Sequence, residues 1–539
     1  MIIESNLVDI HCKEVYPARL TVNGSIIENV ERIDKELKQY VIPGLIDSHI
    51  HIESSLVTPA SFAGQAVSRG TTGVVSDPHE IANVLGVEGI NFMLQDSAKV
   101  PLKFWFGAPS CVPATTFEST GAVIDSFAIG KLLDDHRIKY LAEMMNYPGV
   151  INDDPEVHGK IKAAIKAGKP VDGHAPGLTG RDLRKYVKSG ISTDHECTSL
   201  DKALEKISLG MKILIREGSA ARNLSELKNL IRTNPDMVML CSDDMHPETL
   251  IKRHLDKIIT QLLSEGYDLF NVLRSCTLNP AVHYSLNAGL LQKGQPADFV
   301  LINNYLEMNI LETWIEGKKV YDRGRILFEY KKEDPVNRFQ ASFVSEKQLE
   351  IKKSGNKMRV IQAFDGDLKT RELLINAGKG NYFEPDLKGD ILKIVVKDRY
   401  NDSPPAVALI KGFKLRKGAF ASSVAHDSHN VICIGTNDKD ITLAMNRIIE
   451  MKGGLSVACK NDVEILPLPV AGIMSNMPLK YVAGEYEKMS AKVRSMGSEM
   501  EAPFMTLSFM ALLVIPELKL SDKGLFHGTT FNFVPLFTD

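Results

Sequence analysis

Residues 41–55 read VIPGLIDSHIHIESS and place two histidines, His49 and His51, at the end of an apolar run. The run predicts a buried strand, on which residues two positions apart point to the same face. His49 and His51 therefore face the same way. Two adjacent imidazoles repel each other if both are charged, so a shared metal cation suits them. An H-x-H pair on an exposed edge strand is the ordinary alternative, and the rest of the chain decides between the two interpretations.

Apolar strand-like runs alternate with amphipathic helical segments eight times across residues 42–294. Both this rhythm and the length of the region match a (β/α)₈ TIM-like barrel, although a doubly wound open sheet also alternates in this way. A single long helix from Pro247 to about Glu265 is expected after the eighth strand. Polar groups end seven of the eight strands: His49/His51, Asp77/His79/Glu80, Glu143, His174, His195, Arg216/Glu217 and Asp243/Asp244. Only a closed barrel brings all these ends to one mouth, so the barrel is our prediction.

The regions on both sides of the barrel have a different pattern. Residues 1–41 and 295–335 show short β-type segments, which predict a flanking β-sandwich built from both ends of the barrel chain. Residues 345–539 predict a further C-terminal α+β domain with β-type runs and one clear helix, KDITLAMNRIIEMKGG. The same domain carries a polar cluster, VAHDSHN, from His426 to Asn430. This cluster could cap the barrel mouth or bind an additional ion, and a solvated loop is the plain alternative.

Composition narrows the class of protein. The chain has 539 residues, 44% hydrophobic and 24% charged, as in a globular protein of several domains. A net charge of -3 gives no case for nucleic acid or an anionic membrane as the main partner. No apolar run reaches the ~18 residues of a membrane span, and the N-terminus does not resemble a secretory signal. The seven cysteines include no C-x-x-C motif, so we expect a reduced, cytoplasmic location.

The polar strand ends contain a possible metal-ligand set of four imidazoles and two carboxylates: His49, His51, Glu143, His174, His195 and Asp243. Nitrogen and oxygen ligands without sulfur suit Zn²⁺, Mn²⁺ or Fe²⁺. Six ligands are more than one tetrahedral ion needs. Two ions bridged by a carboxylate and a hydroxide would use all six.

These residues carry a resemblance to a known family. The stretch VIPGLIDSHIHI, a lone His on each of two later strands, Asp on the eighth and the segment PADFVLIN are similar to the amidohydrolase superfamily. The segments HIHIESS, SDPHEIANV, AEMMNYPGV, GHAPGL, STDHE and CSDD resemble the bacterial adenine deaminases more specifically. So does the C-terminal GSEMEAPFMTLSFMALLVIPELKLSDKGLF. The resemblance covers essentially the whole chain.

The resemblance implies hydrolytic deamination of adenine to hypoxanthine and ammonia by a binuclear metal centre, in which Mn²⁺ or Fe²⁺ is favoured over Zn²⁺. It also implies a homodimer with a small-molecule substrate. Glu143 would bridge the two metals, because the nearest lysine, Lys139, lies four residues too early to act as the carboxylated lysine of many relatives. Asp243 would be a ligand and the proton shuttle. The histidine ligands would divide into two pairs, His49 with His51 and His174 with His195.

Contacts to the purine are less defined by the sequence. The candidates are Asp77, His79, Glu80, Glu196, Arg216, Glu217 and Asp244. Some of them could instead form salt bridges around the mouth, and Asp244 could only orient Asp243. Alternatives of the same fold act on cyclic amides, as hydantoinases and dihydroorotases do, or on another aminopurine. A cytidine-deaminase fold would need P-C-x-x-C, which this chain lacks. A barrel serving only as a scaffold should have lost ligands, yet all six are present.

Overall fold

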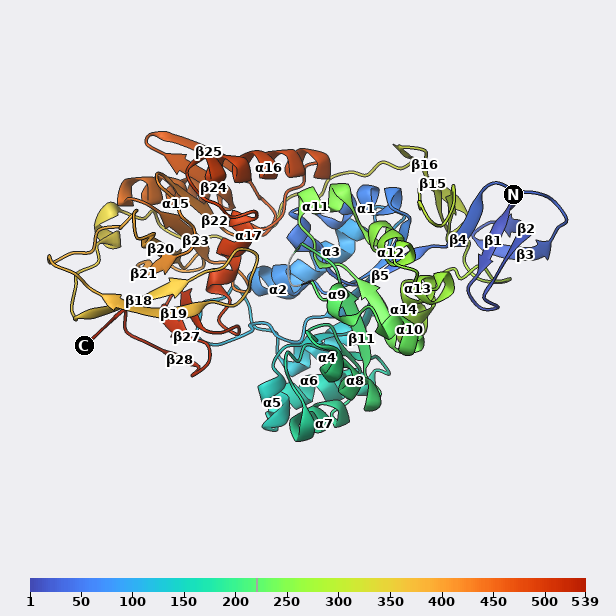
Figure 1. Ribbon diagram of the computed structural model, residues 1–539, viewed down its shortest axis with the longest axis horizontal. Coiled ribbons are helices and arrows are strands. Elements are labelled where there is room, and N and C mark those ends of the chain that lie inside the picture. Colours follow the sequence, from blue (N-terminus) through green and yellow to red (C-terminus); the bar gives the residue numbers. More distant parts are fainter. Residues whose placement is uncertain (220–221) are drawn as a thin grey trace. The chain divides into compact units, whose positions relative to one another are not determined.

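The structure is a computed structural model that describes residues 1–219 and 222–539. The chain divides into two compact units, coloured along the sequence in Figure 1. The first unit comprises Met1–His79, Asn91–Cys111 and Ile124–Glu333. The second comprises Glu80–Ile90, Val112–Val123 and Asp334–Asp539. Two short segments that follow the second and third barrel strands in sequence therefore belong to the C-terminal unit.

The first unit contains a closed barrel of parallel strands. Each strand pairs with the next one in sequence, and the bridge between Val171 and Ile191 joins the fifth strand to the sixth. The short strand β13 (Asp243–Asp244) continues the eighth strand and pairs with the first, which closes the ring. The predicted barrel is thus confirmed. Its strands are β5 (Leu45–His51), β6 (Thr71–Ser76), β7 (Lys103–Ala108), β8 (Ile138–Met144), β9 (Val171–Gly173), β10 (Thr193–Asp194), β11 (Lys212–Arg216) and β12 (Val238–Cys241).

The helices between these strands begin and end at residues suited to helix ends. The side chain of Asp154 caps α6 and Pro155 occupies its first position, while Gly168 follows it with a positive φ of 66°. The helices of this unit, with α2 and α3 at its border, are α1 (Pro59–Ser68), α2 (His79–Leu85), α3 (Val87–Ser97), α4 (Ser126–Asp134), α5 (Tyr147–Ile151), α6 (Pro155–Lys166), α7 (Gly180–Lys188), α8 (Leu200–Ser208), α9 (Leu224–Leu227), α10 (Leu230–Thr233), α11 (Pro247–Lys252), α12 (Leu255–Ser264), α13 (Leu269–Ser275) and α14 (Leu278–His283).

The long helix expected from Pro247 to about Glu265 is wrong, because the structure has two helices, α11 and α12, at this place. Helical geometry is lost at Arg253 and His254. The His254 side chain is fully buried, and its Nε2 lies 2.8 Å from Asp47 Oδ2 inside the barrel. This buried contact takes the place of helix continuation at His254.

Both ends of the barrel chain join in one mixed sheet, which confirms the expected flanking β-structure. Its strand order is β17-β16-β15-β14-β4-β1-β2-β3. A separate small core lies on it, in which Phe299 stacks on Trp314 with ring centroids 5.6 Å apart. The strands are β1 (Ile2–Asp9), β2 (Glu14–Asn23), β3 (Ile26–Arg32), β4 (Tyr40–Pro43), β14 (Phe299–Ile302), β15 (Ile310–Ile315), β16 (Lys318–Asp322) and β17 (Arg325–Ile326).

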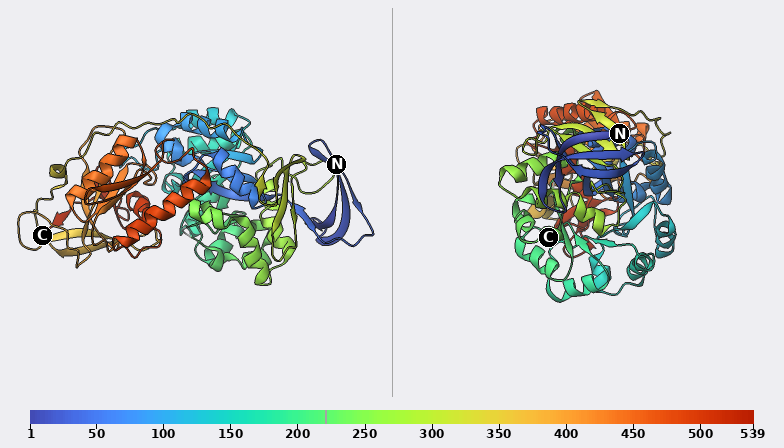
Figure 2. Two further views of the ribbon diagram at one scale, coloured as in Figure 1. Left: turned by 90° about the horizontal axis from the view of Figure 1, so that it is seen from above. Right: turned by 90° about the vertical axis from the view of Figure 1, so that its right-hand side faces the viewer.

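The second unit is an α+β domain, as predicted. Alternation on β22 (Ala419–Ser422) sends Ala419 and Ala421 toward helix α15 (Asp438–Met451), within one apolar cluster. Phe420 points the other way and packs edge-on against Phe504 of α17 (Pro503–Ser508), which in turn contacts Tyr486 of α16 (Leu479–Ser495). Helix α15 therefore covers one face of the sheet, and α16 and α17 cover the other, as the left view of Figure 2 shows.

The main sheet of this unit runs in the order β19-β18-β21-β20-β23-β22-β24-β25, with β29 paired to β18, and a small second sheet follows. No helix in the described part of the chain is both long and apolar enough to cross a membrane. The strands are β18 (Lys357–Gln362), β19 (Arg371–Asn376), β20 (Leu392–Lys397), β21 (Ala406–Lys411), β23 (Val431–Gly435), β24 (Gly454–Cys459), β25 (Asp462–Pro467), β26 (Leu518–Ser521), β27 (Gly524–His527), β28 (Asn532–Phe533) and β29 (Phe537–Thr538).

Candidate metal centre

The first group of predicted ligands meets at the C-terminal ends of β5, β8 and β13. The Nε2 atoms of His49 and His51 lie 3.2 Å apart, and each lies 3.3 Å from Asp243 Oδ1. Glu143 Oε1 lies 3.3 Å from His51 Nε2. The Nδ1–H of His51 donates to the backbone carbonyl of Asp77 at 3.2 Å, which leaves the Nε2 lone pair directed at the cluster. Strand alternation and barrel closure together bring these four side chains into contact.

This spacing fits a bound cation. Four ligands placed tetrahedrally at about 2.0–2.1 Å from an ion lie roughly 3.3–3.4 Å from one another. The observed separations of 3.2 and 3.3 Å among His49, His51 and Asp243 match that edge length. The set is entirely nitrogen and oxygen, which suits Zn²⁺, Mn²⁺ or Fe²⁺. The donor set and the geometry therefore both fit a divalent metal.

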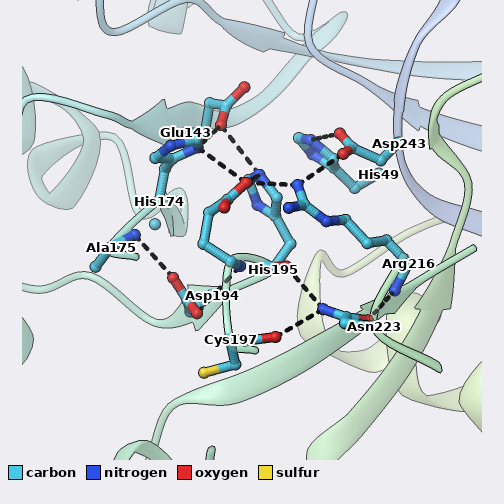
Figure 3. A network of polar contacts seen from close by, with 12 residues as sticks. His49, Glu143, His174, Ala175, Asp194, His195, Cys197, Arg216, Asn223 and Asp243 are labelled. Carbon is cyan, nitrogen blue, oxygen red and sulfur yellow. Dashed lines mark hydrogen bonds and ion pairs between the residues drawn. The ribbon is translucent and has the colours of Figure 1, made fainter. Parts of the chain in front are cut away.

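Glu143 connects this group to the second pair of predicted histidines. Its Oε2 atom lies 2.6 Å from His174 Nδ1 and 3.2 Å from His195 Nε2 (Figure 3). Its Oε1 atom faces His51. One oxygen of this carboxylate thus faces two imidazoles, and the other faces His51. A carboxylate bridging two cations presents its oxygens in this way. The structure brings together all six residues of the predicted ligand set.

The charges of the cluster are mutually stabilising. Burial alone would raise the pKa of Glu143, but the imidazoles of His195 and His174 outweigh it and hold this pKa well below its usual range. Burial would also raise the pKa of Asp243, and here the Arg216 guanidinium and the neighbouring imidazoles hold it low. Both carboxylates are therefore ionised and can act as metal ligands.

Asp243 has a defined orientation. Its Oδ1 faces the two histidines of β5, and its Oδ2 accepts a hydrogen bond from Arg216 Nη1 at 2.8 Å. Its φ of 56° lies in the left-handed region, a strained backbone for a residue other than glycine and a common feature of functional sites. Arg216 Nη1 also contacts Glu196 Oε1 at 2.5 Å. Arg216 and Glu196, both predicted to contact the purine, thus bond to each other beside Asp243.

The predicted purine contacts at the second strand end divide between the two units. His79 Nδ1 lies 3.2 Å from Asp77 Oδ2 and 3.5 Å from Glu143 Oε1, so this pair borders the ligand cluster. Glu80 belongs to the second unit. Its two carboxylate oxygens lie 2.5 Å from His426 Nδ1 and 2.5 Å from His429 Nε2.

Two further candidates point to other partners. The carboxylate of Glu217 lies 3.5 Å from Arg253 Nη1 and 3.7 Å from Arg222 Nε, so it forms the alternative salt bridges. Asp244 accepts a hydrogen bond from the Ser54 hydroxyl at 2.5 Å. Asp243 Oδ1 lies 3.3 Å from the Nε2 atoms of His49 and His51, and no such distance is found for Asp244 among the described residues.

Sequence reasoning missed a layer of buried carboxylates beneath the ligands. Asp47 lies two residues before His49, and it accepts hydrogen bonds from the Ser242 backbone and hydroxyl at 3.0 and 2.5 Å. Asp172 lies two residues before His174, and burial raises its pKa to about 7. Asp194 directly precedes His195. An Asp two residues before His49 and before His174 was the available signal, since alternation places residues two apart on one face.

Asn223 was also missed. Its side-chain oxygen accepts a hydrogen bond from the Arg216 backbone N–H at 2.9 Å. Its Nδ2 donates to the carbonyls of His195 and Cys197 at 3.1 and 3.0 Å (Figure 3). Asn223 therefore ties the end of β11 to the segment that carries His195. Its loop position, away from any strand end, gave no sequence signal.

A closed parallel barrel with a carboxylate-bridged, histidine-rich cluster at its C-terminal mouth defines a metal-dependent hydrolase of the amidohydrolase class. Comparison with known sequences agrees, because a sequence model of the amidohydrolase family matches residues 40–320. A second model, the adenine deaminase C-terminal domain, matches residues 368–532. The chain belongs to the adenine deaminase family of amidohydrolases.

The relatives that establish this are similar over their whole length. Adenine deaminase from Methanosarcina mazei is 49% identical over 547 residues, covering 99% of each chain. The enzyme from Salinibacter ruber is 47% identical and covers 100% of this chain and 99% of its own. That from Parabacteroides distasonis is 46% identical with the same coverage.

Proposed function

We infer that this chain catalyses the hydrolytic deamination of adenine to hypoxanthine and ammonia, a reaction of purine salvage. The observation that carries the inference is the position of Glu143, whose oxygens face His51 on one side and the His174–His195 pair on the other. The chain is also 46–49% identical to adenine deaminases over nearly its full length. Cyclic-amide hydrolases of this fold usually use a carboxylated lysine at the bridge. Glutamate at position 143 therefore favours the deaminase.

The ligand cluster divides into two cation sites. His49 and His51 would hold one cation and His174 and His195 the other, with Glu143 shared and Asp243 on the first site. We propose Mn²⁺ or Fe²⁺ in preference to Zn²⁺, on the mixed imidazole and carboxylate set and the family resemblance. Two such cations supply a strong nucleophile from water near neutral pH.

Asp243 would carry the protons of the reaction. Deamination requires attack at C6, a proton for N1 and a proton for the departing ammonia. Asp243 Oδ1 faces the ligand cluster, where it can take a proton from the attacking water and pass it on, first as general base and then as general acid. Its Oδ2 is held by Arg216, so the carboxylate cannot rotate away from this task.

The buried groups beside the ligands are the proposed purine contacts. Asp77 and His79 border Glu143, and Glu196 lies beside both His174 and Arg216. Asp77 and His79 are buried, and the Glu196 side chain is only 13% exposed, so contacts to substrate there would be made largely out of water, where they are strongest. We further propose a homodimer in a reducing, cytoplasmic location, which is consistent with seven free cysteines.

An ammonia-release assay tests this proposal. The full-length protein, loaded with Mn²⁺, would be offered adenine, other aminopurines and aminopyrimidines, with hydantoin and dihydroorotate followed by ring opening. We expect ammonia from adenine, hypoxanthine as product, and loss of turnover after chelation that returns on adding Mn²⁺. A protein that contains two metals per chain but releases no ammonia from adenine would contradict the proposal. Ring opening of a cyclic amide in its place would identify the alternative.

A further inference from the structure

Lys206 of helix α8 is a charged residue buried inside the barrel wall. Its side chain is 1% exposed. Its Nζ donates hydrogen bonds to Asp194 Oδ2 and to the backbone carbonyl of Ala175, both at 2.8 Å. Asp194 is fully buried, so the two form an ion pair out of contact with water. Neither side chain lies among the predicted ligands.

This ion pair holds both backbone groups of Ala175. The ammonium of Lys206 donates to the Ala175 carbonyl. Asp194 Oδ1 accepts the Ala175 N–H at 2.8 Å (Figure 3). Ala175 directly follows His174, and Asp194 directly precedes His195. The two histidines that face Glu143 Oε2 are therefore joined, one residue away from each, by a single ion pair.

Stability alone is a poor reason for such a pair. Transferring two charges from water into the interior costs several kcal/mol per ion, and replacing a buried ion pair by apolar residues is often neutral or stabilising. An apolar pair could not form the directional hydrogen bonds that Lys206 and Asp194 make to the Ala175 backbone. The pair thus serves the geometry of the neighbouring backbone.

We propose that Lys206 and Asp194 are positioning residues that set the spacing of His174 and His195 and thereby the affinity of the second cation site. This proposal rests on the assignment of that site in the proposed function. Changes beyond the direct ligands typically weaken metal binding by about 10–100-fold. The expected effect of breaking the pair is a loss of this size at one of the two sites.

The test compares the buried Lys206 with the half-buried Lys103. Lys206→Met removes the ammonium while keeping an unbranched side chain. The matched control is Lys103→Met, because Lys103 Nζ bonds Asp298 Oδ2 at 2.7 Å and the Asn287 carbonyl at 2.9 Å at the start of β7, the barrel end away from the ligands. Mn²⁺ stoichiometry and the dissociation constant of each site would be measured by chelator competition, with the unfolding midpoint and the kinetic constants.

We expect Lys206→Met to bind one Mn²⁺ normally and the second about 10–100-fold more weakly, with turnover recovering at high Mn²⁺. Lys103→Met should lose stability but keep both affinities. Wild-type affinity at both sites of Lys206→Met would overturn the proposal, as would an equal loss in Lys103→Met. Wild-type protein that binds fewer than two Mn²⁺ would instead contradict the proposed function, a result obtained before any variant.

Removing one partner leaves an unpaired buried charge, which can prevent folding. If Lys206→Met does not fold, the double variant Asp194→Asn, Lys206→Met tests the proposal instead, because it leaves no unpaired charge buried. The amide oxygen introduced at position 194 can still accept the N–H of Ala175, but the carbonyl of Ala175 loses its ammonium partner. Weaker binding of the second Mn²⁺ would support the proposal, and two wild-type affinities in the folded double variant would overturn it.

Discussion

Replacing Glu143 with glutamine tests the proposed bridge between two cation sites. Glu143 Oε1 faces His51 at 3.3 Å, and Oε2 faces His174 and His195 at 2.6 and 3.2 Å. Glutamine has one oxygen and one NH₂ group, so one side of the bridge loses its oxygen entirely. The other side keeps an oxygen without the negative charge. The volume of the side chain does not change, so the barrel should fold normally.

Glu143→Gln should therefore weaken one of the two proposed cation sites. One site would retain its imidazoles but lose its shared anion, and the loss of a direct ligand should exceed the roughly 10–100-fold cost of an outer partner. We therefore expect about one cation per chain in Glu143→Gln. Turnover should fall by at least ~10²-fold, because in the proposed reaction both cations together would activate the nucleophile.

The assay is metal content by mass spectrometry on the same sample used for ammonia release. Glu205→Gln is the matched control, since Glu205 accepts a hydrogen bond from the Gly180 N–H at 2.8 Å, which glutamine can also accept. The control should keep two cations and normal turnover. Two tightly bound cations and unchanged turnover in Glu143→Gln would refute the bridging role.

Asp243→Asn should cut turnover by at least ~10²-fold, the usual cost of a lost acid/base, and near-normal turnover at neutral pH would rule the residue out as proton shuttle. Burial lowers the pKa of Lys519 to about 7, so from pH 7 toward 10 the unfolded chain binds a proton that the folded chain does not. The free energy of unfolding should therefore rise by about 1.4 kcal/mol per pH unit in that range, and this rise should be absent in Lys519→Met when both proteins are unfolded with denaturant. Parallel pH profiles of the two proteins would contradict the prediction. His426→Ala and His429→Ala each remove a partner of Glu80, and we expect roughly tenfold weaker kcat/KM for adenine with unchanged metal content; wild-type kinetics in both variants would show that these histidines do not serve the site.

The sequence by itself determined the barrel and the candidate ligands. Strand alternation placed His49 and His51 on one face, and the rule that parallel strands share a C-terminal end gathered residues as distant as His49 and Asp243. Both arguments use local periodicity and a general property of barrels, so they need no knowledge of how side chains pack. The one error of this kind was the long helix after Pro247, where a buried contact of His254 overrode a continuous helical pattern.

Only the tertiary structure decided which polar groups pair with each other. The bonds of Arg216 to Asp243, of Lys206 to Asp194 and of His429 to Glu80 join residues 27, 12 and 349 positions apart. No sequence period relates such positions. The tautomer of His429 also emerged only here, because the Ala425 N–H donates to its Nδ1 and so leaves Nε2–H to donate to Glu80.

The membership of residues 80–90 and 112–123 in the C-terminal unit was equally beyond the sequence. These segments follow barrel strands and carry no change of composition that would mark them. Their buried side chains find partners several hundred residues later, as Glu80 does in His429. Local pattern fixes which face of an element is buried, whereas the partner on that face depends on how distant elements pack in three dimensions.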